Sequence, residues 1–404
     1  MTVNANDKEK MVVVEGSYAT AHAVKTARPQ VISAYPITPQ THIVEELSQM
    51  IADAEIPNCE YINVEAEFSA ISALIGSSAA GARSYSATTS QGLYLMHEAL
   101  FNAAGMRLPI VMTVVNRAIS APINIWNDQQ DAISQRDSGW IQIYAEDTQE
   151  AADLVLQAFK LAEDKEIMLP VMVCLDGFIL SHVYEPVVLM DQAEADKFLP
   201  PFRPDDFLDP KCPKSFGTFA DPSSYTEFRY DIERAMTKAL DKIEQISEEF
   251  GAITGRYHGG LVEGYCLDDA EVVIVSMGSI LGSIKEVVDA YRAKGEKIGV
   301  LKIRSFRPFP TEAIAKALSG AKAVAVVDKS ISLGRNEGIL FTEIKAGLYN
   351  DPLNVPIIGF IAGLGGRDIR PNHIEEIIEE TKAVRDSGKV CVETRFNEIR
   401  EELL

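Results

Sequence analysis

The regular alternation of short apolar runs with longer helical segments restricts the fold of this chain more than any other feature. Segments such as 42–53 and 148–164 have apolar residues at helical spacing. Strands that alternate with helices are typical of a parallel sheet. The apolar runs also lack polar alternation, as strands buried on both faces do. The pattern predicts a parallel α/β domain, with strands at 31–35, 61–64, 84–88, 109–115 and 170–175.

The last third of the chain repeats this pattern. Expected strands lie at 271–279, 297–303, 323–328 and 355–363, and the last expected helix lies at 372–386. Between the two units, a proline-rich stretch at 199–213 indicates an extended linker. Apolar residues from Ile232 to Phe250 then recur at spacings of three and four, which indicates a helix. The predicted fold class is α/β, with two parallel-sheet domains at 1–195 and 269–404, joined by the linker and helix at 196–268.

Charge and hydropathy argue against several classes of function. The chain has 38 Lys and Arg residues against 59 Asp and Glu residues, which gives a net charge of −21. Such an acidic chain is poorly suited to bind nucleic acid or an anionic membrane. The longest apolar stretches, such as 108–115, are too short to span a bilayer. Residues 1–10 carry no signal-peptide core, so we expect a cytoplasmic protein.

The cysteines are spread along the chain, and no two of them form a CxxC pair. This spacing argues against a zinc ribbon or an iron–sulfur cluster held by this chain alone. Reduced cytosolic thiols are the simpler interpretation. The five cysteines are Cys59, Cys174, Cys212, Cys266 and Cys391.

Polar residues follow the ends of the expected strands in the first domain. Ligands of open parallel sheets bind beyond the carboxyl ends of the strands. One sheet edge is therefore expected to carry hydroxyls, two carboxylates and a guanidinium, and to form a binding site. The segments are Pro36-Ile37-Thr38-Pro39, Glu65 with Glu67, Thr89-Ser90-Gln91-Gly92 and Asn116-Arg117.

Thr38 and Arg117 each have a structural interpretation beside the functional one. Thr38 lies between two prolines with restricted φ, so its loop can hold a hydroxyl in place or can be a simple turn. Arg117 directly follows an apolar strand, where a partly buried charge needs an anionic partner. That partner is either a structural carboxylate, Asp128 or Asp131, or the carboxylate of a substrate.

Two glutamates, two histidines and a glycine-rich segment also have both a structural and a functional interpretation. Glu67 precedes a helix of small residues at 68–81 and is expected to be desolvated, whereas Glu65 can be a solvated charge at a helix start. His97 and His182 are possible acid–base groups, but lone histidines are more often structural. The glycine-rich segment 363–368 lacks the P-loop lysine arrangement and the full GxGxxG spacing, so we interpret it as a turn, which can lie at an interface.

Four segments in this order resemble one enzyme family. They are 34–41 (AYPITPQT), 86–96 (SATTSQGLYLM), 116–131 (NRAISAPINIWNDQQD) and 175–182 (LDGFILSH). Similar stretches continue at 277–289, 303–310 and 328–338, so the resemblance covers nearly the whole chain. The family is the α subunit of pyruvate:ferredoxin oxidoreductase, in particular the multi-subunit pyruvate synthase of methanogens and related anaerobes.

The resemblance implies a thiamine diphosphate enzyme whose active site is shared between subunits. The first domain would be the pyrimidine-binding domain for this cofactor, and the last would resemble the transketolase C-terminal domain. A β subunit would hold the diphosphate, Mg²⁺ and a 4Fe-4S cluster. A ferredoxin-like δ subunit would carry further clusters, and a γ subunit would complete the assembly. This sequence is consistent with that division, since it has neither a GDG…N magnesium motif nor cysteine clusters.

The resemblance also assigns roles to the residues at the sheet edge. Glu67 matches the glutamate that contacts the aminopyrimidine ring, and Thr38 and Arg117 match the pair that binds the substrate carboxylate. Pro36, Ile37, Ser90 and Gln91 join Glu67 and Thr38 in the implied cofactor site. Asn127 and Gln129 depart from residues common in relatives, but neither belongs to the proposed catalytic set, Glu67 and Arg117.

The implied reaction is the oxidative decarboxylation of pyruvate with coenzyme A to acetyl-CoA and carbon dioxide, with reduction of ferredoxin, and it is reversible. Two alternatives stay open. One is a related enzyme for 2-oxoglutarate, a branched-chain 2-oxoacid or oxalate. The single Arg117 beside Thr38 favours a small monocarboxylate. The other alternative is a non-catalytic assembly subunit.

Overall fold

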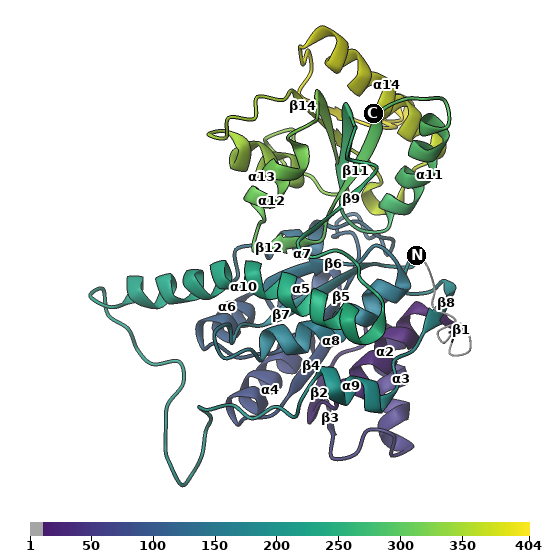
Figure 1. The fold of residues 1–404 in the computed structure, drawn as a ribbon. Helices are drawn as coiled ribbons and strands as arrows, with labels where there is room; N and C mark the ends of the chain where they lie inside the picture. Colours follow the sequence, from purple (N-terminus) through teal and green to yellow (C-terminus); the bar gives the residue numbers. More distant parts are fainter. Residues whose placement is uncertain (1–10) are drawn as a thin grey trace.

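The structure is a computed structural model that describes residues 11–404, and it contains two α/β units, one above the other in Figure 1. The lower unit is built on a seven-stranded sheet with the order β12-β6-β7-β5-β4-β2-β3. Its strands pair in parallel, except that β12 is antiparallel to β6. They are β2 (Val31–Ala34), β3 (Glu60–Asn63), β4 (Ser84–Thr88), β5 (Val111–Asn116), β6 (Ile141–Tyr144), β7 (Val171–Asp176) and β12 (Ser305–Arg307).

Helices cover both faces of this sheet, as the continuous apolar strands predict. Successive side chains of a strand point to opposite faces. In β7, Val171, Val173 and Leu175 therefore join one core, and Met172 and Cys174 join the other. The first core is closed by α2 (Gly16–Ala27), α3 (Thr41–Ala52), α8 (Thr148–Ala162), α9 (Gln192–Phe198) and α10 (Tyr225–Thr254). The second is closed by α4 (Glu67–Ala79), α5 (Ser90–Leu95), α6 (His97–Gly105) and α7 (Gln130–Ile133).

The upper unit has a six-stranded sheet with the order β15-β14-β13-β10-β11-β9, parallel except for β9. One face of this sheet packs on α11 and α14. Side chains on its other face join the second core of the lower unit, so hydrophobic packing is continuous between the two units. Its elements are β9 (Val262–Tyr265), β10 (Val272–Ser276), α11 (Ile280–Arg292), β11 (Ile298–Ile303), α12 (Thr311–Leu318), β13 (Ala323–Asp328), α13 (Ile339–Leu348), β14 (Ile357–Ile361), η1 (Leu364–Gly366), α14 (Pro371–Ser387), β15 (Thr394–Phe396) and η2 (Glu401–Leu403).

The expected strands and helices agree with the structure to within a few residues, with informative exceptions. The expected strand 84–88 coincides with β4, and the expected helix from Ile232 extends to the 30 residues of α10. β6 is missing from the sequence-based expectation because Gln142 interrupts its apolar run. This side chain is buried and donates from Nε2 to the carbonyl oxygen of Ala132 at 2.6 Å, so it is tolerated inside the sheet.

One strand of the second unit belongs to the sheet of the first unit. The strand β12 belongs in sequence to the second unit but pairs with β6 at the edge of the lower sheet. The proposed boundary at 195/196 lies within α9, and α9 and α10 both pack on the lower unit. The proline-rich linker, residues 199–224, forms the long irregular loop before α10 in Figure 1. The domain limits therefore stay a prediction, and the contacts place α9 and α10 with the first unit.

Two shorter features complete the description. β1 (Met11–Glu15) and β8 (Tyr184–Val188) form a two-stranded antiparallel sheet beside α2. Every helix in residues 11–404 is too short or too polar to cross a membrane.

A buried ionic cluster joins α8 to the second unit. Glu150, on α8, accepts from Lys302 Nζ at 2.8 Å and from Arg304 Nε at 2.9 Å. All three side chains are almost fully buried. Arg304 also donates to Gln157 at 2.8 Å and to Ser247 at 3.0 Å. Burial alone would raise the pKa of Glu150, but the charges of Lys302 and Arg304 lower it to about 2.

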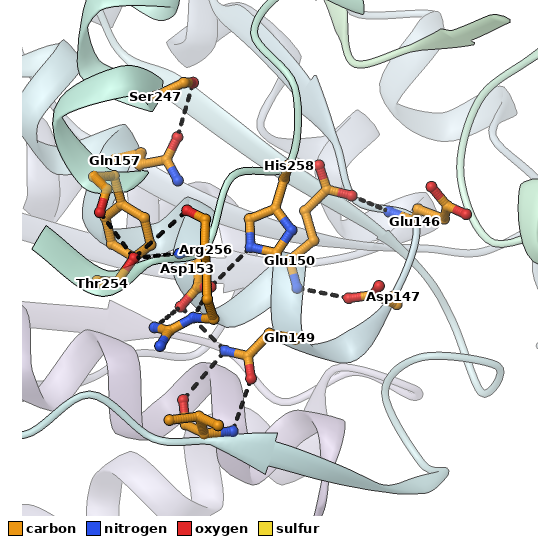
Figure 2. A network of polar contacts seen from close by, with 12 residues as sticks. Glu146, Asp147, Gln149, Glu150, Asp153, Gln157, Ser247, Thr254, Arg256 and His258 are labelled. Atoms are coloured by element: carbon orange, nitrogen blue, oxygen red, sulfur yellow. Dashed lines mark hydrogen bonds and ion pairs between the residues drawn. The ribbon is translucent and has the colours of Figure 1, made fainter. Parts of the chain in front are cut away.

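A second charged group lies one turn further along α8. In Figure 2, Asp153 lies between Arg256 and His258, which both come from the segment after α10. Its carboxylate accepts from Arg256 at 2.7 and 2.8 Å and is 2.8 Å from His258 Nε2. Burial opposes the charged form of His258, but Asp153 outweighs burial and raises the pKa of this imidazole. The ionic cluster at Glu150 and the contacts of Asp153 together hold the segment after α10 against the first unit.

Candidate active site

The four polar segments predicted from the sequence meet at the carboxyl end of the lower sheet. Their strands are neighbours, because β5, β4, β2 and β3 are adjacent in the sheet order. Arg117, just after β5, connects the segments that follow β2 and β4. Its guanidinium donates to the carbonyl oxygen of Thr38 at 2.9 Å, to Gln91 Oε1 at 3.2 Å and to the carbonyl oxygen of Asn124 at 3.0 Å. The predicted substrate pair, Thr38 and Arg117, is therefore in direct contact.

The structural interpretation of Arg117 as the ion-pair partner of Asp128 or Asp131 is wrong. Within residues 11–404, no carboxylate lies at ion-pair distance from this guanidinium. Asp131 instead accepts from the backbone N–H of Arg117 at 3.0 Å, and Asp128 accepts from the backbone N–H of Gln130 and of Gly365, both at 3.1 Å. A guanidinium has five N–H groups, and three are used, so two remain for an anion.

Asp131 is a residue whose importance the sequence did not reveal. It is fully buried and also accepts from the backbone N–H of Ser90 at 3.0 Å and from Asn116 Nδ2 at 2.7 Å. Burial raises its pKa to about 7, against the lowering effect of these donors. Ser90, whose φ is 47°, lies in the left-handed region that non-glycine residues rarely adopt. Asp131 therefore holds the Ser90 loop and the Arg117 loop together.

Glu67 is the first residue of α4 and is buried, with 7% of its surface exposed. Within residues 11–404, no group forms a hydrogen bond or an ion pair with its carboxylate. Glu65 differs, since it lies on the surface and accepts from the Ser69 hydroxyl at 2.5 Å, which lowers its pKa. A buried carboxylate without a donor is costly unless a ligand supplies one. The structure therefore supports the choice of Glu67 over Glu65.

The surroundings of Glu67 have the features of a ligand site. A Cβ atom at Gly92 would lie 2.7 Å from both Glu67 Oε1 and Thr88 Oγ1, so only glycine leaves room for these groups. The Thr88 hydroxyl and Gln91 Nε2 are buried and have no hydrogen-bond partner in the described part of the chain, residues 11–404. Buried polar atoms without partners are rare in folded proteins. These groups fit a polar, ring-shaped cofactor that brings its own donors and acceptors.

The remaining predicted residues lie on the open side of this edge. Pro36 and Thr38 are exposed, and Ile37 is half-buried. The Thr38–Pro39 peptide bond is cis. Ser90 is buried, and its hydroxyl donates to the carbonyl oxygen of Ala118 at 2.6 Å and contacts Gln91 Oε1 at 2.7 Å. Ser90 therefore supports the loop, whereas Gln91 connects it to Arg117.

The second unit reaches the same edge through a buried ion pair. Asp176, at the end of β7, accepts from Lys329 Nζ at 3.1 Å and from the Ser279 backbone N–H at 3.0 Å. Gln129 donates from Nε2 to the Met277 carbonyl oxygen at 3.2 Å. These contacts seat the carboxyl ends of β10 and β13 beside the candidate site. The sequence offered one signal for Asp176, an acidic residue directly after a buried strand.

The two histidines and the glycine-rich segment predicted from the sequence form contacts within the protein. His97 Nδ1 is 2.5 Å from Gln135 Oε1, and His182 Nδ1 is 2.8 Å from the Ser181 hydroxyl oxygen. Segment 363–368 contains the short 3-10 turn η1, and the Gly365 carbonyl oxygen accepts from Asn124 Nδ2 at 3.0 Å. This segment is therefore a turn at the interface between the two units, as predicted.

Comparisons with known proteins agree with this arrangement. The family model for the thiamine diphosphate-binding part of pyruvate flavodoxin/ferredoxin oxidoreductase matches residues 22–248, and core domain II of pyruvate:ferredoxin oxidoreductase matches residues 270–374. Pyruvate synthase subunit PorA of Methanosarcina barkeri is 68% identical over 98% of both chains. PorA of Methanothermobacter thermautotrophicus is 52% identical over 92% of this chain and 95% of its own.

Two further relatives show the breadth of the similarity. Ketoisovalerate oxidoreductase subunit VorA of Pyrococcus abyssi is 46% identical over 96% of this chain and 98% of its own. Among solved structures, a 2-oxoglutarate:ferredoxin oxidoreductase from Magnetococcus marinus matches 92% of this chain and 65% of its own, with a TM-score of 0.73 and 18% identity, which shows a shared fold. Taken with the family models that match both units, these similarities show that the chain belongs to the pyruvate:ferredoxin oxidoreductase family.

Proposed function

We propose that this chain is the α subunit of a pyruvate synthase. Together with β, γ and ferredoxin-like δ subunits it would convert pyruvate and coenzyme A to acetyl-CoA and carbon dioxide and reduce ferredoxin, in a reversible reaction. The relative at 68% identity, a pyruvate synthase subunit over nearly its full length, supports pyruvate as the substrate. Thiamine diphosphate would be shared with the β subunit, which would hold Mg²⁺ and a 4Fe-4S cluster, with further clusters on the δ subunit.

The observation that carries this proposal is the buried, unpartnered carboxylate of Glu67 over Gly92. When bound, thiamine diphosphate supplies the carbanion-stabilising chemistry that decarboxylation of a 2-oxoacid needs. Glu67 Oε1 would share a proton with a ring nitrogen of the pyrimidine, as a buried carboxylate without another donor can. The Thr88 hydroxyl and Gln91 Nε2, both without partners, would provide further polar contacts to this ring.

Arg117 and Thr38 would hold the substrate. The guanidinium donates to three neutral acceptors, which set its direction, and it forms no ion pair within residues 11–404. Burial lowers its pKa, and the Asp131 carboxylate only partly opposes this effect. Its two remaining N–H groups would bind the carboxylate of pyruvate, and the exposed Thr38 hydroxyl would add a further donor. A carboxylate held in this way is oriented for loss as carbon dioxide.

Replacing Arg117 with leucine is expected to lower kcat/KM for pyruvate at least tenfold to hundredfold. This follows from the loss of a charge-assisted contact of about 1.5–3 kcal/mol. The melting temperature should change little, because the guanidinium forms no ion pair with a carboxylate within residues 11–404. Pyruvate kinetics and thermal unfolding of the same variant in the assembled complex test this. Arg117→Lys is a useful second variant, since it keeps the charge without the planar fork. Unchanged kinetics with a lowered melting temperature would remove Arg117 from the site.

The isolated chain is expected to hold no stoichiometric iron and to lack 2-oxoacid oxidation activity. The physical reason is that its five cysteines are all unpaired and are spread along the chain, so they offer no cluster of thiolate ligands. Iron and sulfide assays on the purified chain, and dye reduction with pyruvate before and after adding the cluster-bearing subunits, check this. Stoichiometric iron and sulfide in the single chain would contradict it.

A branched-chain 2-oxoacid is the second candidate substrate, because VorA, a ketoisovalerate oxidoreductase subunit, is 46% identical. A substrate panel on the whole complex, with pyruvate, 2-ketoisovalerate, 2-oxoglutarate and oxalate, distinguishes the candidates. Pyruvate should give the highest kcat/KM. A higher value for 2-ketoisovalerate would transfer the proposal to that substrate.

A further inference from the structure

Three side chains from separate parts of the lower unit converge beside the candidate active site. Glu15 ends β1, His42 lies in the first turn of α3, and His182 lies in the loop between β7 and β8. One donor atom from each lies within 4.8 Å of the donor atoms of the other two. The reaction proposed above does not use any of them. We propose that they form a site for a divalent transition-metal ion of the Zn²⁺ type.

The donor set has the chemistry of such a site. Two imidazoles and one carboxylate are common protein ligands of Zn²⁺ and other first-row divalent ions, whereas Mg²⁺ and Ca²⁺ prefer oxygen donors alone. Metal–ligand bonds of about 2.0–2.1 Å place the ligand atoms of a tetrahedral ion roughly 3.3 Å apart. His42 Nδ1 and Glu15 Oε1 are 2.6 Å apart, and the rings of His42 and His182 have centroids 4.5 Å apart. Small side-chain shifts would therefore suffice.

A hydrogen bond to Ser181 orients the His182 ring for metal binding. Its Nδ1 lies 2.8 Å from the Ser181 hydroxyl oxygen, which already accepts from the backbone N–H of Phe178 at 2.9 Å. When the Nδ1–H donates to Ser181, Nε2 carries the free lone pair that a metal requires. Such an outer hydrogen bond accompanies almost every metal-binding histidine, because it fixes the tautomer and the ring orientation. The Phe178 ring, with its centroid 4.7 Å from that of His182, restricts the ring further.

The location gives the ion a structural role. The three residues tie β1 and the loop after β7 to the start of α3, the helix that directly follows the Thr38–Pro39 segment. The same loop packs on that segment, since a Cβ atom at Gly177 would lie 2.7 Å from Pro39 Cγ. Glu15 and His42 are partly exposed, with 17% and 44% of their side chains accessible, so an ion can enter from solvent. A bound ion would hold the substrate loop in place without touching the substrate.

The test is direct metal binding to the full chain. After treatment with a chelator, the purified protein is titrated with Zn²⁺ by calorimetry and with Co²⁺ by visible absorption. One saturable equivalent, with the d–d spectrum of nitrogen and oxygen ligands, is expected, and excess Mg²⁺ should not displace it. His42→Ala and His182→Ala should each lower the affinity by 10-fold or more, which is the range seen on losing groups that support a metal site. His97→Ala is the matched control and should leave the affinity unchanged.

Several results would overturn the proposal. Absence of saturable binding would show that Glu15 and His42 form an ordinary ion pair. Full binding in the His42→Ala and His182→Ala variants would show that the ion binds elsewhere, and a thiolate-to-cobalt charge-transfer band would place it at a cysteine. Circular dichroism checks that each variant is folded. If either histidine variant is unfolded, Glu15→Gln, which keeps the side-chain shape, is used instead, and unchanged affinity in that variant would equally refute the site.

Discussion

Replacing Glu67 with glutamine is expected to lower kcat for pyruvate on the order of 10²-fold or more in the assembled enzyme. Removal of an acid–base group typically costs this much. Glutamine keeps the size and burial of the side chain, but its neutral amide cannot share a proton with the cofactor ring as a carboxylate can. Assembly with the partner subunits should be normal, because Glu67 has no ion-pair or hydrogen-bond partner within residues 11–404. The measurement is kcat at saturating pyruvate, coenzyme A and thiamine diphosphate, with sedimentation analysis of the complex.

Glu65→Gln is the matched control for this prediction. It removes the same charge two positions earlier, from an exposed side chain that accepts a hydrogen bond from the Ser69 hydroxyl. Its kcat should stay near that of the unmodified enzyme. Near-normal turnover of the Glu67 variant would show that this glutamate is misassigned. If both variants were fully active, the alternative of a non-catalytic assembly subunit would be favoured.

Replacing Glu150 with alanine is expected to lower the free energy of unfolding by about 3–5 kcal/mol at neutral pH, the usual cost of breaking a buried ion pair from one side. The reason is that Arg304, which is 1% exposed, would keep its charge without an ion-pair partner within residues 11–404, whereas Lys302 would keep Glu263 at 3.1 Å and Glu146 at 3.2 Å. Urea denaturation of the two proteins, followed by circular dichroism, measures the difference. Glu249→Ala is the control, since this exposed glutamate pairs with Lys160 at the surface and should contribute less than about 1 kcal/mol.

The same carboxylate predicts a pH dependence with a definite sign. Folding lowers the pKa of Glu150 from 4.5 to about 2, so the folded protein binds this proton less tightly than the unfolded chain. The contribution to stability is therefore fully present above pH 4.5 and is lost as the pH falls towards 2. The stability difference between the unmodified protein and the Glu150 variant should narrow between pH 5 and pH 3. A constant difference over this range would show that the ion pair is not its source.

Much of the fold follows from local pattern. The expected strand 84–88 coincides with β4, and all five of its residues are buried, as in a strand whose two faces are both covered. The strand β6 was not found, because buried Gln142 resembles a surface residue until its partner, the Ala132 carbonyl oxygen, is known. β12 was not found either, because only three residues form it and its partner strand lies more than 150 positions earlier.

Only part of the candidate site could be predicted from local sequence pattern. Its edge followed from the positions of Thr38, Glu67 and Arg117 after strands, since parallel strands end together. The choice of Glu67 over Glu65 rested on the family resemblance, and burial now supports it. The sequence left open which anion the Arg117 guanidinium pairs with. The interpretation that it pairs with Asp131 is wrong, because Asp131 accepts a hydrogen bond from the backbone N–H of Arg117 and not from its side chain. Backbone donors are identical at every residue, so sequence cannot show which of them a carboxylate will bind.

The sequence by itself determined the α/β class, the two units and the edge that carries the polar residues, because these depend on the order of apolar and polar residues along short segments. The tertiary structure decided which distant charges meet. Glu150 is 152 positions from Lys302, and Glu15, His42 and His182 come from three separate elements. Such pairings depend on how helices and loops pack across the sheet, and packing sums many weak contacts that no single stretch of sequence contains.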